Sequence, residues 1–471
     1  MKENIFLKSA LTEDNPFIKT EEVIDWLKSR NREINVNISK IDFDSLDQWY
    51  IDQNEGRIRH KSGKFFSIDG ISVKTNWGGK NKWEQPIINQ PEIGILGILT
   101  KEFNGILYFL MQAKIEPGNV NNVQLSPTLQ ATKSNYSQVH KGRKPLYLDY
   151  FLETDRYEIL LDQFQSEQGA RFLKKRNRNI IVKVNSDIEK HQDFIWLTLG
   201  QIKKLIQFDN LVNMDSRTVI SGIPYGSYDK QVVDFFNTIY PYNAENSFKN
   251  GLLNSALIRD NALHSIDEIL NWFTNLKGQF ELEVTPISLF NINDWQFEKD
   301  QLRHSENKFF KVIAVKIEIG NREVISWSQP LIQPMQEGLI VFIVKKINGI
   351  YHFLVQAKLE SGNFDILEFA PTVQCLTGNY KETEENALPF LDYVLRAKRD
   401  QIKFDALQSE EGGRFFQEQN RNLIIEVDDE FSIDVPDNYT WITLNQLNLF
   451  LKFNNYLNIQ ARSLISSLAF I

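Results

Sequence analysis

Apolar and polar residues along this chain follow a pattern that predicts β-hairpins. Residues 93–100 and 106–114 are mostly apolar, and the Asn104-Gly105 pair between them suits the positive φ angles of a tight turn. The same pattern recurs in residues 338–344 and 350–358, around Asn348-Gly349. Shorter apolar runs at 180–184 and 423–427 indicate one further strand in each half of the chain. The pattern therefore predicts a β-sheet in each half.

Residues that cap helices stand before several amphipathic stretches. Thr20 precedes an acidic first turn, and Ser265 stands three residues before Glu268, the spacing of a capping box. Thr198 and Thr443 precede amphipathic stretches at 199–208 and 444–453. The residues on either side of Gly169 and Gly412 also have helical character. We therefore predict an α+β fold in which each half is a mixed sheet flanked by a few helices, with a strand order that the pattern does not fix.

The two halves carry the same motif, here called the signature motif. Gln112-Ala-Lys-Ile-Glu116-Pro-Gly118-Asn119, then Pro127-Thr128-Leu-Gln130 and Asn135-Tyr136, returns as Gln356-Ala-Lys-Leu-Glu360-Ser-Gly362-Asn363, Pro371-Thr372-Val-Gln374 and Asn379-Tyr380. Aligned without gaps, residues 83–136 and 327–380 are identical at 22 of 54 positions. The chain is therefore a tandem duplication, and each signature motif begins at the end of a predicted core strand.

A second shared motif, Gln-Ser-Glu-x-Gly-x-Arg-Phe, spans residues 165–172 and 408–415 and is followed by Asn-Arg-Asn. Trp26 corresponds to Trp272, which indicates that the duplication begins near residue 20. We divide the chain into an N-terminal arm (1–19), a first repeat (20–221), a connector (222–264) and a second repeat (265–471). We expect the polar arm to be loosely attached and part of the aromatic connector to pack.

Composition and charge narrow the class of protein. With 42% hydrophobic residues in 471, each half can bury a sizeable core. The net charge of −8 argues against nucleic acid as a partner. Cys375 is the only cysteine, which excludes an intramolecular disulfide and a cysteine-rich zinc site. Because the chain lacks a signal-peptide pattern and any run of about 20 apolar residues, we expect a soluble cytoplasmic protein without a membrane partner.

Taken together, the paired motifs resemble those of the NDP-hexose 2,3-dehydratases of deoxysugar biosynthesis, over nearly the whole chain. The resemblance implies two tandem Nudix-hydrolase-like domains and a homodimer. It implies a nucleotide-linked 4-keto-6-deoxyhexose as substrate, most often with dTDP as the carrier, and a 3-ketoreductase as the downstream enzyme. It is also compatible with a nucleotide-sugar pocket in each domain, one of them a non-catalytic relic of the duplication.

One departure from Nudix hydrolases concerns metal chemistry. Neither half contains their Gly-x5-Glu-x7-Arg-Glu-x2-Glu-Glu-x-Gly box, which supplies the glutamates that bind Mg²⁺. We therefore expect no metal site, and a Nudix-type pyrophosphohydrolase is the weaker alternative function. A non-catalytic nucleotide-sugar binding protein is the other alternative.

The reaction of the family removes water across C-2 and C-3 of a 4-ketosugar and in principle needs no redox cofactor, so we expect no cofactor. It needs a base for the C-3 proton, a donor to the departing C-2 hydroxyl, and donors to the C-4 oxygen as enolate charge develops. His60, Glu116 and Tyr136 are the candidates for proton transfer, with Lys114 beside them. A buried structural histidine and a salt bridge between Lys114 and Glu116 are the alternative roles.

Other polar and aromatic residues are candidates for binding the sugar, the diphosphate and the base. Hydrogen-bonding candidates in the first copy are Gln112, Asn119, Ser126, Thr128, Gln130, Ser134 and Asn135. Arginine suits phosphate oxygens, and the candidates are Arg59, Arg171, Arg178, Arg414 and Arg421, with structural ion pairs as the alternative. Trp49, Trp83 and Tyr136 could stack on a base or belong to the core. The second copy offers Trp295, Arg303, His304, Gln356, Lys358, Glu360, Asn363, Thr372, Gln374, Asn379 and Tyr380.

The two copies differ in polarity around the signature motif. The first has Ser126, Thr132, Ser134 and His140 where the second has Ala370, Leu376, Gly378 and Glu384. Because more polar groups are present in the first copy, we expect the N-terminal pocket to be catalytic. The second pocket would then be kept for binding or for dimer structure.

Overall fold

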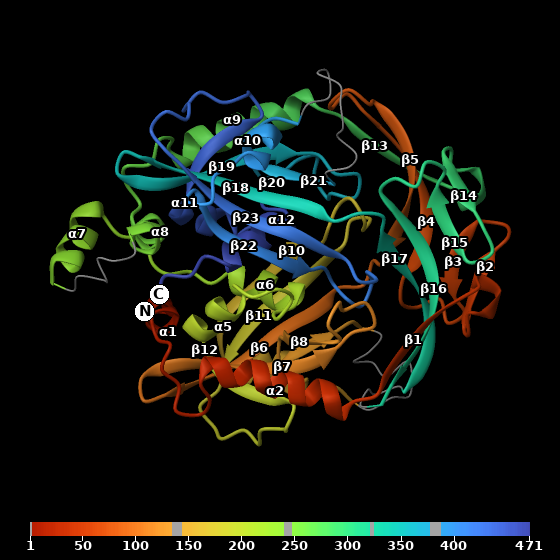
Figure 1. Cartoon of the computed structure of the whole chain (residues 1–471), viewed down its shortest axis with the longest axis horizontal. Helices are drawn as coiled ribbons and strands as arrows, with labels where there is room; N and C mark the ends of the chain where they lie inside the picture. The colour runs from red at the N-terminus through yellow and green to blue at the C-terminus, as the bar shows by residue number, and fades with distance from the viewer. Residues whose placement is uncertain (1, 134–143, 240–246, 321–324, 377–387) are drawn as a thin grey trace.

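Each half of the protein builds one large and one small β-sheet, and helices pack around them (Figure 1). The computed structural model describes residues 2–133, 144–239, 247–320, 325–376 and 388–471. Two seven-stranded and two five-stranded sheets contain the described strands. The prediction of an α+β fold repeated in two halves is confirmed.

The large sheet of the first half is built on the predicted hairpin. β6 (Gly94–Phe103) and β7 (Ile106–Ile115) pair antiparallel, and Asn104 and Gly105 have φ angles of 50° and 75° at the turn. The hairpin prediction is confirmed. The other strands are β8 (Val123–Ser126), β9 (Leu129–Ala131), β10 (Glu158–Ser166), β11 (Arg176–Lys183) and β12 (Phe194–Thr198). They give the order β10-β11-β6-β7-β12, with β8 on β7, β9 on β6, and β11 parallel to β6.

The second half repeats this sheet. β18 (Gly338–Ile347) and β19 (Ile350–Lys358) form its hairpin. The strands around them are β20 (Glu368–Pro371), β21 (Val373–Leu376), β22 (Ile402–Ser409), β23 (Gln419–Val427) and β24 (Tyr439–Thr443). In both halves the second strand of the hairpin, β7 or β19, ends within the signature motif, so the polar side chains of the motif leave each sheet at the equivalent edge.

The two small sheets exchange strands between the halves. β1 (Val36–Ile41) comes from the first half but pairs antiparallel with β16 (Phe310–Ile319), from Val36 opposite Ile319 to Ile41 opposite Ala314. In return, β13 (Leu282–Ile287) pairs with β4 (Ser67–Thr75) of the first half. The remaining strands are β2 (Trp49–Asp52), β3 (Arg57–His60), β5 (Lys82–Asn89), β14 (Trp295–Phe297), β15 (Gln301–His304) and β17 (Ser326–Pro334). Neither half completes its small sheet alone.

The segments around Gly169 and Gly412 are loops, so the prediction of helix there is wrong. Each loop joins two strands of its large sheet and bonds to the signature motif of the other half. Gly118 N donates to Gly412 O at 2.7 Å, and Gly362 N donates to Gly169 O at 2.6 Å. A Cβ on Gly118 would lie 1.5 Å from Phe415 O, so the close approach requires glycine. These long-range bonds outweigh the local helical tendency.

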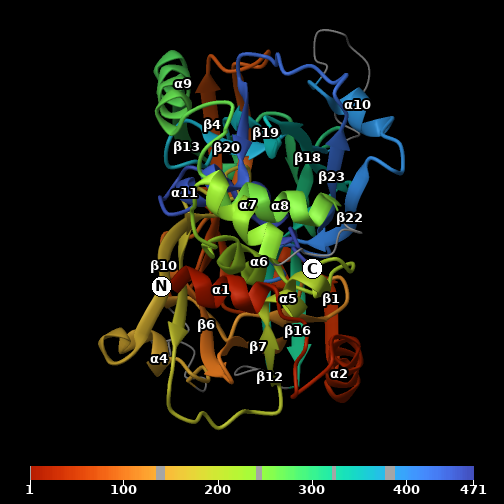
Figure 2. The ribbon, with the colours of Figure 1, turned by 90° about the vertical axis from the view of Figure 1, so that its left-hand side faces the viewer.

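Equivalent helices cover the two large sheets. α1 (Lys2–Ala10) packs on β7 as α8 (Ser247–Leu257) packs on β19, and α2 (Thr20–Glu33) corresponds to α9 (Ile266–Gln279). Figure 2 shows α1 and α8 on one side of the molecule. Phe6 and Ala10 are fully buried, and Ser9 Oγ donates to Leu107 O at 2.6 Å. The expectation of a loosely attached arm is therefore wrong, because Phe6 and Ala10, one helical turn apart, give α1 an apolar face.

The connector packs in part, as expected. Leu252 and Leu253 of α8 are buried, whereas Phe235 of α7 (Lys230–Ile239) is exposed. The predicted caps at Ser265, Thr198 and Thr443 are confirmed, because each side-chain oxygen accepts a hydrogen bond from the backbone N–H of the third helical residue. The predicted cap at Thr20 is wrong by one position, because Lys19 is the N-cap residue. The short remaining elements are α4 (Asp149–Leu152), α10 (Leu391–Leu395) and the 3-10 turns Phe43–Ser45, Thr154–Arg156 and Leu289–Asn291.

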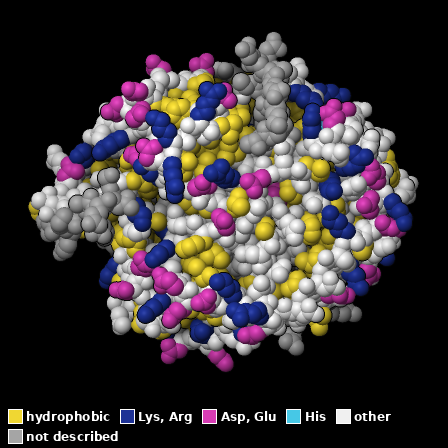
Figure 3. Space-filling view, viewed as in Figure 1, with side chains coloured by type: hydrophobic (Ala, Val, Ile, Leu, Met, Phe, Trp, Pro, Cys, Tyr) yellow, Lys and Arg dark blue, Asp and Glu magenta, His cyan; other side chains and the backbone are white. Residues whose placement is uncertain are grey.

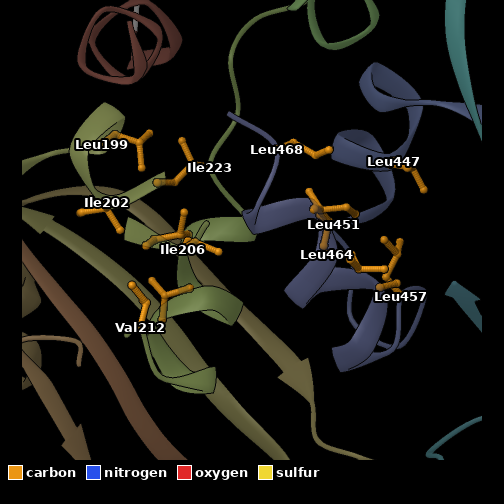
Figure 4. Packing of buried hydrophobic residues seen from close by; sticks show 14 of the residues in the cluster. Leu199, Ile202, Ile206, Val212, Ile223, Leu447, Leu451, Leu457, Leu464 and Leu468 are labelled. Atoms are coloured by element: carbon orange, nitrogen blue, oxygen red, sulfur yellow. The ribbon is translucent and has the colours of Figure 1, made fainter. Parts of the chain in front are cut away.

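The halves meet in the middle of the molecule through four helices. α5 (Leu199–Leu205) and α6 (Met214–Ser221) face α11 (Leu444–Phe450) and α12 (Ile459–Ser466), and their apolar side chains lie between them (Figure 4). α5 and α11 end before the predicted residues 208 and 453. Two buried arginines cross the boundary: Arg217 donates to Ser409 O, and Arg462 donates to Ser166 O. The two halves therefore share one interior.

The surface carries charges of both signs. On the face drawn in Figure 3, basic and acidic side chains are interspersed among apolar ones. No helix in the described part of the chain is both long and apolar enough to cross a membrane.

Candidate active site

A cavity of about 350 Å³ lies where the signature motif of the first half meets the second half. Small-ligand pockets typically have ~300–1,000 Å³. Its walls include the candidates Trp49, His60, Lys114, Glu116, Gln130 and Arg414. Other lining residues were not among the predicted site residues: Asp47, Gln48, Phe65, Phe66, Gln90, Lys175, Asn177, Asp215, Trp327, Gln329, Glu411 and Gly413. The cavity is thus formed by both repeats.

The signature motif brings Lys114 and Glu116 to one edge of the large sheet. Both side chains are buried, with less than a tenth of each residue exposed. Gln130 Nε2 donates to Glu116 Oε1 at 2.7 Å, and Lys114 Nζ donates to Gln130 O at 3.3 Å. Ser126 Oγ donates to Gln130 Oε1 at 3.1 Å and so helps to orient the amide. The second carboxylate oxygen, Glu116 Oε2, is buried without a hydrogen-bond partner among the described residues.

His60 and Trp49 form an aromatic wall from the small sheet. The two residues are cross-strand neighbours on β3 and β2, and their rings meet edge to face with centroids 5.3 Å apart. The His60 ring also meets Phe65 at 4.6 Å, and its Nδ1 lies 2.7 Å from Ser62 Oγ. The histidine is half-buried, not enclosed in the core. Its ring therefore lies at the border between the cavity and solvent.

The opposite wall comes from the second half. Trp327 Nε1 donates to Gln329 Oε1 at 3.0 Å, and Gln329 Nε2 donates to Gly413 O at 2.8 Å. The Arg414 guanidinium lies 4.2 Å from the ring centroid of Phe66, an attractive cation–π distance, and its Nε donates to Gln90 Oε1 at 3.1 Å. These contacts hold a cation and an indole against the first signature motif.

Burial and mutual repulsion raise the pKa values of two acids of the cavity, Glu411 and Asp215. Burial, together with the charges of Glu167 and Glu116, raises the pKa of Glu411 to about 7, against the opposing charges of Arg414 and Lys175. Burial also raises the pKa of Asp215 well above its ordinary value, and the charges of Glu411 and Glu116 add to this effect. Burial lowers the pKa of Lys175. Such perturbed groups in a cavity are typical of acid–base chemistry.

Several predicted binding residues lie outside the cavity. Ion pairs hold Arg178 to Asp162, Arg421 to Asp405, Arg303 to Glu298, and Arg59 to Asp52 and Glu55. Thr128 and Thr372 donate to the backbone oxygens of Leu110 and Leu354, and Gln356 donates to Pro371 O. Gln112 pairs with Ser126 across β7 and β8, and Asn119 Nδ2 donates to Asn122 O. Ser134, Asn135, Tyr136, His140, Gly378, Asn379, Tyr380 and Glu384 lie outside the described residues.

An equivalent arrangement with different charges, also built from both repeats, surrounds the second signature motif. Glu360 Oε1 accepts from Gln374 Nε2 at 2.9 Å, Arg171 lies 4.2 Å from the Phe310 ring centroid, and Trp83 Nε1 donates to Gln85 Oε1 at 2.9 Å. Trp295 and His304 meet edge to face at 5.6 Å. However, Gln168, Gln460 and Glu418 stand where the first arrangement has Glu411, Asp215 and Lys175. A comparison of the charges of the two repeats, position by position, could have indicated Glu411, Asp215 and Lys175 from the sequence.

Comparison with known proteins identifies the family. The family model described as NDP-hexose 2,3-dehydratase matches residues 20–223 and again residues 266–468. The chain belongs to this family. The resemblance inferred from the signature motifs is therefore confirmed, and both copies of the family unit contribute to the cavity.

Three relatives of this NDP-hexose 2,3-dehydratase family member align over almost its whole length. A protein of Saccharopolyspora spinosa named dTDP-4-dehydro-6-deoxy-alpha-D-glucopyranose 2,3-dehydratase is 45% identical over 98% of this chain and 94% of its own. Proteins of the same name from Amycolatopsis orientalis and Streptomyces violaceoruber are 41% and 40% identical. These two alignments cover 97% and 94% of this chain, and 92% and 95% of the relatives.

Proposed function

We propose that this protein removes water across C-2 and C-3 of dTDP-4-dehydro-6-deoxyglucose and that the reaction takes place in the cavity between the repeats. The product is the 3,4-diketo-2,6-dideoxy sugar. Membership of the family and the activity for which the three relatives are named support the reaction. The buried, unpaired oxygen of Glu116 is the observation that carries the choice of this cavity.

Glu116 is the proposed base for the C-3 proton. Its Oε1 is held by Gln130, which fixes the direction of the carboxylate and leaves Oε2 to accept a proton. The electron pair of the broken C–H bond moves toward C-4, where the ketone oxygen becomes an enolate. Lys114, two residues before Glu116, is the proposed cation beside that oxygen, since a preformed positive charge stabilises a developing negative one.

His60 has a different proposed place in the reaction. Its Nδ1 contacts Ser62 and its ring lies against Trp49 and Phe65 at the rim of the cavity. This position suits a contact with the sugar or the carrier more than abstraction of the C-3 proton. Arg414 is the proposed diphosphate ligand, because it is the predicted arginine that lines the cavity, and Trp49 and Trp327 are the proposed walls for the base.

The proposal extends to fold and assembly. Each half is proposed to be Nudix-hydrolase-like, which its mixed sheet with a parallel pair and a long hairpin supports. Superposition of an experimental structure on a Nudix hydrolase would test this. The protein is further proposed to be a cytoplasmic homodimer whose product is the substrate of a 3-ketoreductase. Light scattering of the purified protein would give the oligomeric state.

The reaction is tested with purified protein and dTDP-4-keto-6-deoxyglucose in D₂O, without added metal or nicotinamide. Mass spectrometry measures loss of one water and deuterium uptake at C-3. Because the diketone is labile, a parallel tube contains a 3-ketoreductase with its nicotinamide cofactor to trap the product. Water loss with a trapped 2,6-dideoxy sugar supports the dehydratase. Binding without water loss or exchange would contradict it and favour a binding protein.

A further inference from the structure

The loop that docks on the first signature motif carries an acid into the cavity. Gly118 N donates to Gly412 O, and Gln417 N donates to Gly118 O, both at 2.7 Å. These two bonds clamp residues 411–417 of the second half against the strand end that holds Glu116. Glu411 precedes Gly412 directly, so its side chain lines the cavity from the opposite side.

Glu411 and Glu116 flank one point in space. A methyl group placed on Gly413 would lie 3.1 Å from Glu411 Oε1 and 3.5 Å from Glu116 Oε1. The two carboxylates therefore approach the same small volume from the two repeats. One acid from each repeat thus lies in the same part of the cavity, where neighbouring carbons of a bound sugar, C-3 and C-2, could each meet one carboxyl group.

The Glu411 carboxylate accepts no hydrogen bond from the described residues that would fix it in a structural role. None of the described residues donates a hydrogen bond to its carboxylate, although Arg414, Lys175, Glu167, Glu116 and Asp215 influence it through their charges. Its equivalent, Gln168, has a structural role, because Gln168 Nε2 donates to Glu410 Oε2 in the interior. A second buried acid, Asp215, also lines the cavity without a hydrogen bond to its carboxylate from the described residues.

We propose that Glu411, supplied by the second repeat, is the catalytic acid that protonates the departing C-2 hydroxyl. This inference rests on the proposed dehydration. Glu116 takes the proton from C-3, and the enolate electrons return to form the C-2–C-3 double bond. The C-2–oxygen bond breaks as Glu411 transfers its proton to that oxygen, and water leaves. The resulting 3-hydroxy enol gains a proton at C-2 and loses one from its oxygen, which restores both carboxyl groups.

The acidity of Glu411 agrees with this role. A donor must be protonated before the reaction, and burial raises the pKa of Glu411 to about 7, against an ordinary value near 4.5. The lining acids Glu116 and Asp215 and the nearby Glu167 oppose its ionisation, while Arg414 and Lys175 favour it. Because the acid form is lost as pH rises through about 7, turnover of the wild type should fall on the alkaline side.

The test separates proton abstraction from water loss. Glu411→Gln keeps the shape of the side chain but cannot give up a proton, so we expect water loss to fall about 10²–10⁴-fold. Glu116 is unchanged, so deuterium exchange at C-3 should continue within a few-fold of its wild-type rate. The alkaline limb of the pH profile near 7 should disappear. Asp405→Asn, the same change of acid to amide at a surface ion pair, is the control and should leave both rates within about twofold.

Three results would overturn the assignment. Exchange and water loss could fall together, which would place Glu411 in deprotonation or binding, or both could persist, which would remove it from the chemistry. An alkaline limb near pH 7 that persists in Glu411→Gln would also contradict the assignment. Glu411→Asp retains a carboxyl group and should recover part of the rate of water loss. This variant tests the assignment if Glu411→Gln folds poorly. A wild type that neither exchanges nor loses water would instead reject the proposed dehydration itself.

Discussion

The two halves of the molecule build the same scaffold around different charges. In both, a glutamine amide holds the signature glutamate, an arginine stacks on a phenylalanine, and a tryptophan bonds to a glutamine. The first arrangement adds Glu411, Asp215 and Lys175, whereas the second has Gln168, Gln460 and Glu418. The contacts that both copies keep are those that position side chains. The groups that differ are those that can exchange protons.

Substitution of the paired glutamates should give the largest difference between the halves. Glu116→Gln removes the proposed base while keeping a side chain that can bond to Gln130, so turnover should fall about 10²–10⁴-fold. Glu360→Gln makes the same change in the second arrangement, and turnover should stay within a few-fold. Initial rates of water loss, measured by mass spectrometry, compare the two variants.

The location of the active site depends on this pair. Deuterium exchange at C-3 should vanish in Glu116→Gln, unlike in Glu411→Gln, because abstraction of the proton comes first. Thermal unfolding of both variants controls for folding. Equal losses in the two variants, or a larger loss in Glu360→Gln, would move the reaction out of the first cavity.

A single methyl group also distinguishes the two copies. Gly413 lies beside the carboxylates of Glu411 and Glu116, and its equivalent beside the second signature motif is Ala170, a residue of the first repeat. Gly413→Ala should push Glu411 out of line and lower turnover about 10–100-fold, since small misplacements of reacting groups are costly. Substrate binding, measured by calorimetry, should change less.

Ala170→Gly is the matched control for this methyl group. It should leave turnover unchanged and cost at most about 1 kcal/mol of stability through added freedom of the unfolded chain. If Gly413→Ala were fully active, the space between the two carboxylates would not be the place of reaction.

A buried acid in the second half should make stability depend on pH. Glu368 accepts from Ser166 Oγ at 3.0 Å, and burial raises its pKa to about 7, against an ordinary value near 4.5. The folded state thus holds the proton more tightly than the unfolded state, so stability falls as pH rises from about 4.5 to 7. Glu368→Gln should remove this dependence and raise the free energy of unfolding at pH 8 by about 1–2 kcal/mol.

The first half contains the control for Glu368. Its equivalent is Gln124, whose Oε1 accepts from Ser409 Oγ at 2.8 Å, so an amide fits this position. Gln124→Glu should introduce a pH dependence of the same sign. Urea unfolding at pH 5 and pH 8 measures both. If Glu368→Gln were instead less stable than the wild type at pH 8, the attraction between the Glu368 carboxylate and Arg462 would outweigh the cost of burying the charge.

The local pattern predicted the fold of each half but not how the halves combine. The Asn104-Gly105 turn and the cap at Ser265 depend on neighbouring residues, and both were predicted correctly. The exchange of β1 and β13 involves strands paired with residues more than two hundred positions away, which periodicity does not record. The loop at Gly412 was predicted to be helical because its backbone bonds to Gly118 lie outside the local window.

The same limit applies to the candidate site. Glu116, Lys114 and His60 were found because they belong to motifs that both repeats keep. Glu411 and Asp215 were not predicted because each is an acid in one repeat only: their equivalents are Gln168 and Gln460. A cavity assembled from both repeats is therefore best predicted from their similarities and their differences together.

The surface arginines should give the smallest effects and thereby define the edge of the site. Arg178 and Arg421 occupy equivalent positions, and each forms a two-point ion pair with an aspartate, Asp162 or Asp405, at the surface. Exposed ion pairs contribute roughly 0.2–1 kcal/mol, so Arg178→Ala and Arg421→Ala should lower stability by no more than this. Because neither arginine lines the cavity, KM for the dTDP-sugar should stay within about twofold in both. A tenfold rise of KM in either variant would place the diphosphate at that arginine, and the assignment of the phosphates to Arg414 would then be lost.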